Sequence, residues 1–237
     1  MIKRFFSQEW AKLKEMNFTD KRQYIWEYYK AHIFMLGFAA FMIGSLINIW
    51  FINPPRQDYL YIAWQAGHVH TDRLDAMGEQ LGIIIPAEGR YRVTVQSYVL
   101  VNEPQVDEAL IMRFSALITV GDLHATITSS QGILEGAELG LLGAPEAVLE
   151  IIREYDVDFY EYLNERLLYL TYTPWGEEDL VTESMALRIG GAPMFTEMGI
   201  MSDDLYLGII VNSRQTDGIA RAIKVMFGVY QPEEYTA

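Results

Sequence analysis

The sequence contains no cysteine, and this absence removes several classes of site. Disulfides, thiolate metal sites, a cysteine nucleophile and a lipid-modified cysteine all require that residue. Apolar residues make up 51% of the 237 residues, enough to bury a core. The sequence therefore predicts one folded domain with appendages, stabilised by packing rather than by crosslinks.

Basic residues are scarce after residue 31. Residues 1 to 31 contain seven Lys or Arg and four acids, a net charge of +3, whereas the remainder has 11 bases and 28 acids, a net charge of −17. Binding to a phosphate backbone needs clustered Lys and Arg. Nucleic acid is therefore not an expected partner.

Charge is also missing from Ile33 to Ile52, a run of 20 residues whose polar side chains are Ser45 and Asn48. A helix of that length is about 30 Å long, the thickness of the hydrocarbon core of a bilayer. A core helix of a soluble domain normally has a polar face, and this run is apolar all round. The run predicts a transmembrane helix over residues 32 to 53, so that the membrane itself is a partner through Ile33 to Ile52.

The flanks of this run predict that it is retained and oriented. Its leader, residues 1 to 31, is too long for a signal peptide, and no small-x-small cleavage site follows the run. The seven basic residues precede it, and the positive-inside rule places the side with more Lys and Arg in the cytoplasm. We therefore expect a single-pass protein of the cell membrane with a cytoplasmic basic segment (1 to 31), an extracellular domain (56 to 229) and an acidic tail (230 to 237).

The residues after the run alternate between strand-like and helix-like patterns. Alternation of this kind predicts an α/β fold with three layers and a mainly parallel sheet. The expected strands are 58–64, 91–101, 123–128, 167–173, 185–189 and 205–211, with the fourth and fifth forming an antiparallel hairpin. The expected helices are 71–81, 105–119, 145–155, 159–164 and 217–227.

Four stretches carry a resemblance to a known group of proteins: Tyr24 to Ile33 (Y-I-W-x-Y-Y-K-x-H-I), Ala116 to Leu123 (A-x-I-x-x-G-D-L), Leu187 to Phe195, and Tyr206 to Ser213. They resemble single-span proteins of Gram-positive bacteria whose extracellular domains are similar to type II extracellular solute-binding proteins. The resemblance implies recognition of a solute at the cell surface. His124 replaces an acid that is usual in that strand. The 182 residues after Pro55 correspond to little more than one of the two lobes of such a protein, so the implied fold is a truncated lobe.

Thr128-Ser-Ser-Gln-Gly132 leaves the third expected strand and enters a helical region. Free backbone N–H groups at such a helix start can hold an anion, and an open parallel sheet binds ligands beyond the carboxyl ends of its strands. The alternative is a capped loop, which uses the same residue types. The predicted ligand-binding residues are Trp64, Gln65, His68, Ser129 and Ser130.

His68 and His70 form a His-x-His pair after the first expected strand, a pattern found in metal-dependent hydrolases. Such a site needs further ligands, and the chain offers only His32 and His124 besides. No G-x-S-x-G elbow, P-loop or G-x-G-x-x-G occurs. We therefore expect no metal, no cofactor and no enzymatic activity. The leading hypothesis is a membrane-anchored extracellular recognition or accessory domain of degenerate solute-binding type, with a small solute or another membrane protein as its candidate partner. The alternatives are a structural or assembly component that contacts other membrane proteins and, less favoured, a metal-dependent hydrolase.

Overall fold

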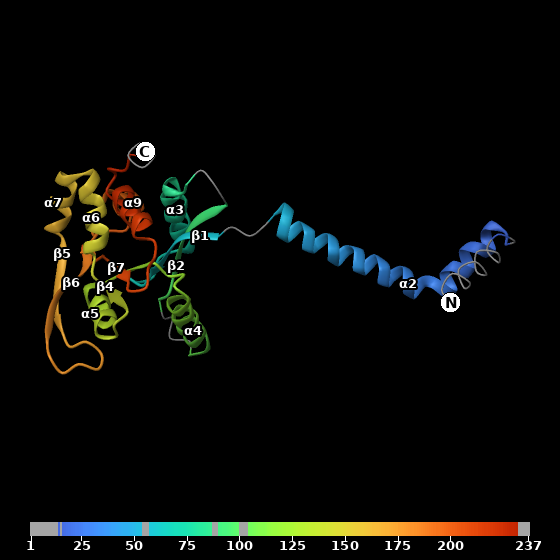
Figure 1. The fold of residues 1–237 in the computed structure, drawn as a ribbon, viewed down its shortest axis with the longest axis horizontal. Coiled ribbons are helices and arrows are strands. Elements are labelled where there is room, and N and C mark those ends of the chain that lie inside the picture. Colours follow the sequence, from blue (N-terminus) through green and yellow to red (C-terminus); the bar gives the residue numbers. More distant parts are fainter. Residues whose placement is uncertain (1–13, 15, 54–56, 87–89, 100–103, 232–237) are drawn as a thin grey trace. The chain divides into compact units, whose positions relative to one another are not determined.

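The computed structural model describes residue 14 and residues 16–53, 57–86, 90–99 and 104–231 (Figure 1). The chain forms two compact units, one comprising residues 1–55 and the other residues 56–237. The boundary between them falls directly after the expected transmembrane run.

The first unit contains one long helix, α2 (Phe18–Ile47), which continues into a π-helical turn, η1 (Asn48–Ile52). Asn17 caps the start of α2, and its side-chain oxygen accepts a hydrogen bond from the backbone N–H of Phe18 at 2.8 Å. The segment Trp26–Ile52 is long and apolar enough to cross a membrane. The expected apolar helix is therefore present. Pro54 and Pro55 and most of the expected acidic tail lie outside the described residues.

The second unit is a mixed α/β domain in which helices and strands alternate along the chain. Its helices are α3 (Thr71–Leu81), the 3₁₀ turn η2 (Gly82–Ile84), α4 (Pro104–Val120), α5 (Ser130–Glu138), α6 (Glu146–Tyr155), α7 (Val157–Asn164), α8 (Pro193–Glu197) and α9 (Thr216–Met226). Its strands are β1 (Gln57–Trp64), β2 (Tyr91–Ser97), β3 (Ala125–Thr128), β4 (Leu142–Gly143), β5 (Leu167–Tyr172), β6 (Val181–Arg188) and β7 (Tyr206–Ile210).

The seven strands form one sheet in the order β2-β1-β3-β7-β6-β5, and β4 pairs with the end of β7. Strands β2 and β3 both run parallel to β1. Strand β7 runs antiparallel to β3, β4 and β6, and β5 runs antiparallel to β6. The sheet is therefore mixed, with a parallel half and an antiparallel half.

The expected mainly parallel sheet is correct only for the half built from β2, β1 and β3. The predicted hairpin of β5 and β6 is confirmed, and a hairpin is antiparallel by construction. The sequence did not reveal that β7 inserts between β3 and β6 in the opposite direction. Strand pairing between segments far apart in the chain depends on the whole fold, which a local pattern does not report.

Helices cover both faces of this sheet, which confirms the three layers. One apolar cluster joins the sheet to α3, α6, α7, α8 and α9, and a second joins the opposite face to α4 and α5. Figure 1 shows these two groups of helices on opposite sides of the strands. Strand β1 supplies both clusters by alternation: Leu60, Ile62 and Trp64 face the first, and Tyr61 and Ala63 face the second.

Backbone segments approach most closely at Gly190, two residues after β6. A Cβ atom at this position would lie 2.5 Å from the carbonyl oxygen of Asp203 and 2.8 Å from that of Ser202. Gly82, at the end of α3, differs because a Cβ there would meet only the Ile85 side chain at 3.9 Å. The fold therefore requires a residue without a side chain at position 190 but not at position 82.

We expect Gly190→Ala to lower the free energy of unfolding by about 2 kcal/mol or more, because backbone must move to admit the methyl group. Gly82→Ala is the matched control, and its effect should stay within about 1 kcal/mol. Urea unfolding of the chain in lipid nanodiscs, followed by tryptophan fluorescence, measures both values. Equal stability of the two variants would contradict the close approach at Gly190.

Candidate functional site

The two connections that surround β1 cross opposite faces of the sheet. Helix α3 connects β1 to β2 over one face, and α4 connects β2 to β3 over the other, since the two helices pack in different clusters. The order β2-β1-β3 thus creates a switch point between β1 and β3. In open α/β sheets, ligands bind beyond the carboxyl ends of the strands at such a point.

A groove opens at this switch point, on the face of the sheet that α4 and α5 cover. Its volume is about 380 Å³, which is within the range of small-molecule sites. Apolar side chains form most of its walls, including Tyr98, Phe114 of α4, Leu139 and Leu142. The rings of Tyr98 and Phe114 are in contact, with centroids 5.4 Å apart, so α4 and the end of β2 form one continuous wall.

The polar groups of the groove lie at the ends of β1 and β3 and on α5. Gln65 follows β1, and its side-chain oxygen accepts a hydrogen bond from the Thr126 hydroxyl at 2.8 Å. The nitrogen of that amide is then the group that can donate to a bound molecule. On α5, the side-chain nitrogen of Gln131 donates to the Glu135 carboxylate at 3.0 Å. Glu135 is the one charged side chain among the described residues that line the groove.

The structure brings together two of the five predicted ligand-binding residues, Gln65 and Ser129. Trp64 does not join them, because alternation turns its side chain to the opposite face of the sheet. There it is 1% exposed, its ring N–H donates to the Gly67 carbonyl at 2.9 Å, and it packs against Phe195. Trp64 is therefore a core residue, which corrects its assignment to the site.

His68 and Ser130 are also outside the described lining of the groove. His68 lies exposed in the loop after β1, and Ser130 is the first residue of α5. Whether the groove takes a ligand stays a prediction.

The start of α5 is occupied by groups of the protein itself. The Ser129 hydroxyl accepts a hydrogen bond from the backbone N–H of Gly132 at 3.3 Å, and the Asp204 carboxylate accepts one from the backbone N–H of Ser130 at 3.1 Å. A carboxylate at this position also interacts favourably with the positive end of the helix dipole. The structure therefore shows a capped loop, with Asp204 as a second acceptor at the start of α5.

No group of three or more His, Asp or Glu side chains that could hold a metal ion occurs in the described part of the chain. His68 and His70 are both exposed on either side of Val69 in the loop that leads into α3. Among the described residues, no further group of potential ligands therefore lies beside His68 and His70 to complete the metal site of the hydrolase alternative.

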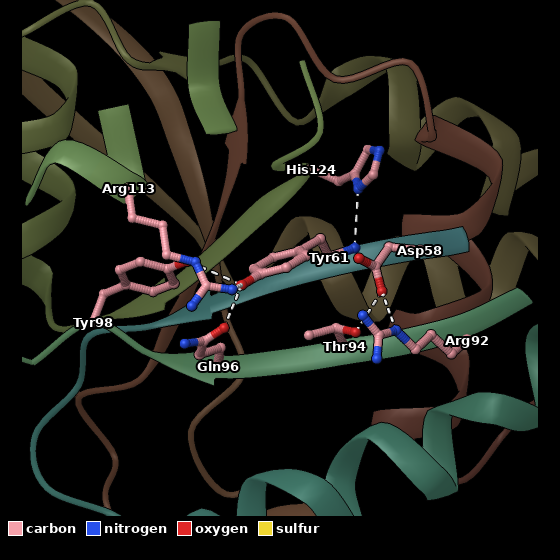
Figure 2. A network of polar contacts seen from close by, with 8 residues as sticks. All are labelled: Asp58, Tyr61, Arg92, Thr94, Gln96, Tyr98, Arg113 and His124. Carbon is pink, nitrogen blue, oxygen red and sulfur yellow. Dashed lines mark hydrogen bonds and ion pairs between the residues drawn. The ribbon is translucent and has the colours of Figure 1, made fainter. Parts of the chain in front are cut away.

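A polar network below the groove was not anticipated from the sequence (Figure 2). The Tyr61 hydroxyl donates to the side-chain oxygen of Gln96 at 2.6 Å, and it lies 2.9 Å from the Tyr98 hydroxyl. Because Tyr61 has one hydroxyl hydrogen, which Gln96 receives, Tyr98 is the donor in the second bond. Arg113 of α4 also donates to the Tyr61 oxygen, at 3.4 Å. Burial and the bond to Tyr61 raise the pKa of Tyr98 well above its usual value. The network therefore fixes a neutral Tyr98 as part of the groove wall.

His124 attaches this network to the backbone of β1. Its Nδ1 accepts a hydrogen bond from the backbone N–H of Tyr61 at 2.9 Å, so this nitrogen carries no hydrogen. His124 is 6% exposed, and burial lowers the pKa of its imidazole, although the nearby Asp122 and Asp58 carboxylates oppose that shift. Asp58 is in turn held by Arg92 at 2.7 Å and by the Thr94 hydroxyl at 2.6 Å. His124 is thus a neutral, structural acceptor.

Sequence reasoning missed Tyr98, Phe114, Gln131 and Glu135 as groove residues. The helical spacing of Phe114 with other apolar residues, and the four-residue spacing of Gln131 and Glu135, indicate that each group shares one face of a helix. What the sequence did not supply was the face of the sheet on which each helix lies.

Comparison of the chain with protein-family models, with curated proteins and with solved structures finds no match. The resemblance to single-span proteins with a solute-binding-like domain therefore stays a prediction.

Stability should fall in acid because of His124. Its pKa is lowered in the folded state, so the unfolded chain binds the proton more readily, and stability is lost as pH falls below the usual histidine value of 6.5. One such group changes the free energy of unfolding by at most about 1.4 kcal/mol for each pH unit. His124→Asn keeps an acceptor near the Tyr61 N–H but does not titrate, so its stability should depend less on pH between 7.5 and 5. Urea unfolding of both chains across this range is the measurement, and parallel pH profiles would contradict the assignment.

Proposed function

We propose that this protein is a membrane-anchored recognition module whose folded domain lies outside the cell and binds a small solute in the groove between α4 and α5. The observation that carries the proposal is the coincidence of a groove of about 380 Å³ with the carboxyl ends of β1 and β3 at the switch point of the sheet. The apolar helix Trp26–Ile52 supplies the anchor, and the seven basic residues before the charge-free run support the orientation.

The lining of the groove suggests the chemistry of the solute. Aromatic and aliphatic side chains favour an apolar portion, and the amide of Gln65 can donate to an acceptor on it. Glu135 disfavours an anion, and the carboxylate of Asp204 already takes the nearby N–H of α5. We therefore expect a neutral or singly cationic solute with an apolar part, such as an amine or a sugar derivative.

A second candidate function is that of a structural or assembly component that contacts other membrane proteins. Exposed apolar side chains at the tip of the β5–β6 hairpin favour it. Trp175 and Leu180 are 80% and 69% exposed there, and large exposed apolar side chains are typical anchors of protein interfaces. The three acids between them, Glu177, Glu178 and Asp179, disfavour contact with an anionic lipid surface. The two functions differ in whether the α4/α5 groove takes a solute.

The orientation can be tested cleanly because the chain has no cysteine of its own. Ser202→Cys introduces an exposed thiol in the domain, and Thr19→Cys introduces one at the start of α2. In intact cells, a membrane-impermeant maleimide should label the first thiol but not the second until the cells are lysed. Labelling of Thr19→Cys alone would reverse the proposed topology.

The groove can be tested by thermal-shift screening of the full chain in nanodiscs against amines, sugars, amino acids and anions. A neutral or cationic solute should raise the midpoint of unfolding, since a ligand at about 100 times its Kd stabilises by about 2.7 kcal/mol. Gln65→Ala should weaken that solute about tenfold, the loss expected for one hydrogen bond, whereas Gln80→Ala on the exposed side of α3 should not. A response to anions alone, or to no solute, would reject the groove as a solute site and favour the assembly function.

A further inference from the structure

Strand β2 forms an outer edge of the sheet. It pairs with β1 along one side, from Tyr91 to Ser97, and no other strand of the described residues pairs with its opposite side. An unpaired edge presents a row of backbone N–H and C=O groups to any chain that approaches it in an extended conformation. Natural sheets usually shield such an edge with charges, proline or a covering segment, and Val93, Thr94 and Val95 in the middle of β2 carry neither charge nor proline.

A groove runs beside this edge, between β2 and α3. Its volume is about 590 Å³, and its lining combines Thr94 and Val95 of β2 with side chains of α3 and of the turn that follows it. Helix α3 lies directly against β2 at Gly78, where a Cβ atom would be only 2.9 Å from the Val93 carbonyl oxygen. The groove therefore has a strand edge as one wall and a helix as the other, which is the arrangement that accepts an added strand.

The helix wall of this groove is acidic. Asp75 and Glu79 lie one turn apart on α3, both exposed and both lining the groove. Neither forms an ion pair with a basic side chain of the described residues. The one basic side chain among the described lining residues, Arg92, already binds Asp58 at 2.7 Å. Ile85, which is partly exposed, contributes apolar surface to the same groove.

We propose that this groove binds an extended, basic segment of a partner protein, which adds to the sheet as a strand beside β2. Main-chain hydrogen bonds to β2 hold the segment, and its side chains alternate between the two faces of the sheet. Those on the α3 side place their aliphatic stems over Ile85 and their charges near Asp75 and Glu79. An acidic segment is repelled by the same two carboxylates.

This site is separate from the proposed solute groove. The α4/α5 groove lies on the opposite face of the sheet from α3, and the two share no described lining residue. Either site can therefore be lost without the other.

The test uses the full chain in nanodiscs of phosphatidylcholine, a lipid without net charge that does not attract a basic peptide. The probe is the fluorescein-labelled peptide Thr-Lys-Val-Lys-Val-Lys-Thr-amide, and fluorescence anisotropy measures its binding up to about 1 mM. A second peptide of the same sequence carries a methyl group on each internal backbone nitrogen. It keeps the charges but cannot donate main-chain hydrogen bonds, so it should bind at least about tenfold more weakly.

The charge requirement has a matched control. Asp75→Lys combined with Glu79→Lys should weaken the unmethylated peptide at least about tenfold, because both carboxylates near the lysines are reversed. Glu108→Lys combined with Glu138→Lys changes the net charge equally at exposed positions on α4 and α5, and should alter binding by less than about threefold. Circular dichroism should be the same for both double variants, since all four positions are exposed.

Three results would overturn the proposal. The first is no binding of the peptide at about 1 mM, and the second is equal binding of the methylated peptide, which would indicate charge attraction without strand addition. The third is self-association of the chain in detergent that the Asp75/Glu79 double reversal dissociates, because the occupant of the groove would then be a second copy of this chain. Binding that depends on backbone N–H groups and on both carboxylates supports the proposal.

Discussion

The central position of β1 determines how the rest of the domain is arranged around the sheet. Its backbone pairs with a parallel strand on each side, and every side chain from Leu60 to Trp64 is buried on one face or the other. Because parallel crossovers are right-handed, the connection from β1 to β2 crosses one face of the sheet and the connection from β2 back to β3 crosses the other. The α4/α5 groove lies at the carboxyl ends of β1 and β3, at the switch point between them. The free edge exists because β3 occupies the other side of β1, which leaves β2 outermost.

The features that the sequence predicted correctly are those that a short segment determines by itself. The charge-free run predicts the apolar part of α2 and η1 without reference to the rest of the chain, and the strand patterns at 167–173 and 185–189 predict the β5–β6 hairpin. Gln65 and Ser129 could be placed together because the ends of neighbouring parallel strands meet at one edge of a sheet. The error at Trp64 has a related origin. Because successive side chains of a strand point to opposite faces of the sheet, Trp64 and Gln65 cannot both line the groove. Only the packed structure shows which of the two faces carries it.

The remaining features depend on register between distant segments. The hydroxyl groups of Tyr61 and Tyr98 meet because β1 and β2 pair with one particular offset, in which Ile62 lies beside Val95. His124 accepts the Tyr61 N–H across a separation of 63 residues. A shift of one residue in either pairing would reverse the facing of the strand and remove the whole network. Such contacts belong to the assembled sheet, and no local pattern in the sequence encodes them.

The bond between Asp204 and the start of α5 has a consequence for the surroundings in which the domain can work. A helix start with free N–H groups is an open receptor for phosphate, sulfate or any other small anion dissolved nearby. Here the protein carries its own carboxylate in that place, fixed by the loop before β7. An anion from the medium must therefore compete with a tethered carboxylate for the backbone N–H of Ser130. The Asp204 carboxylate thus reduces the attraction of this helix start for dissolved anions.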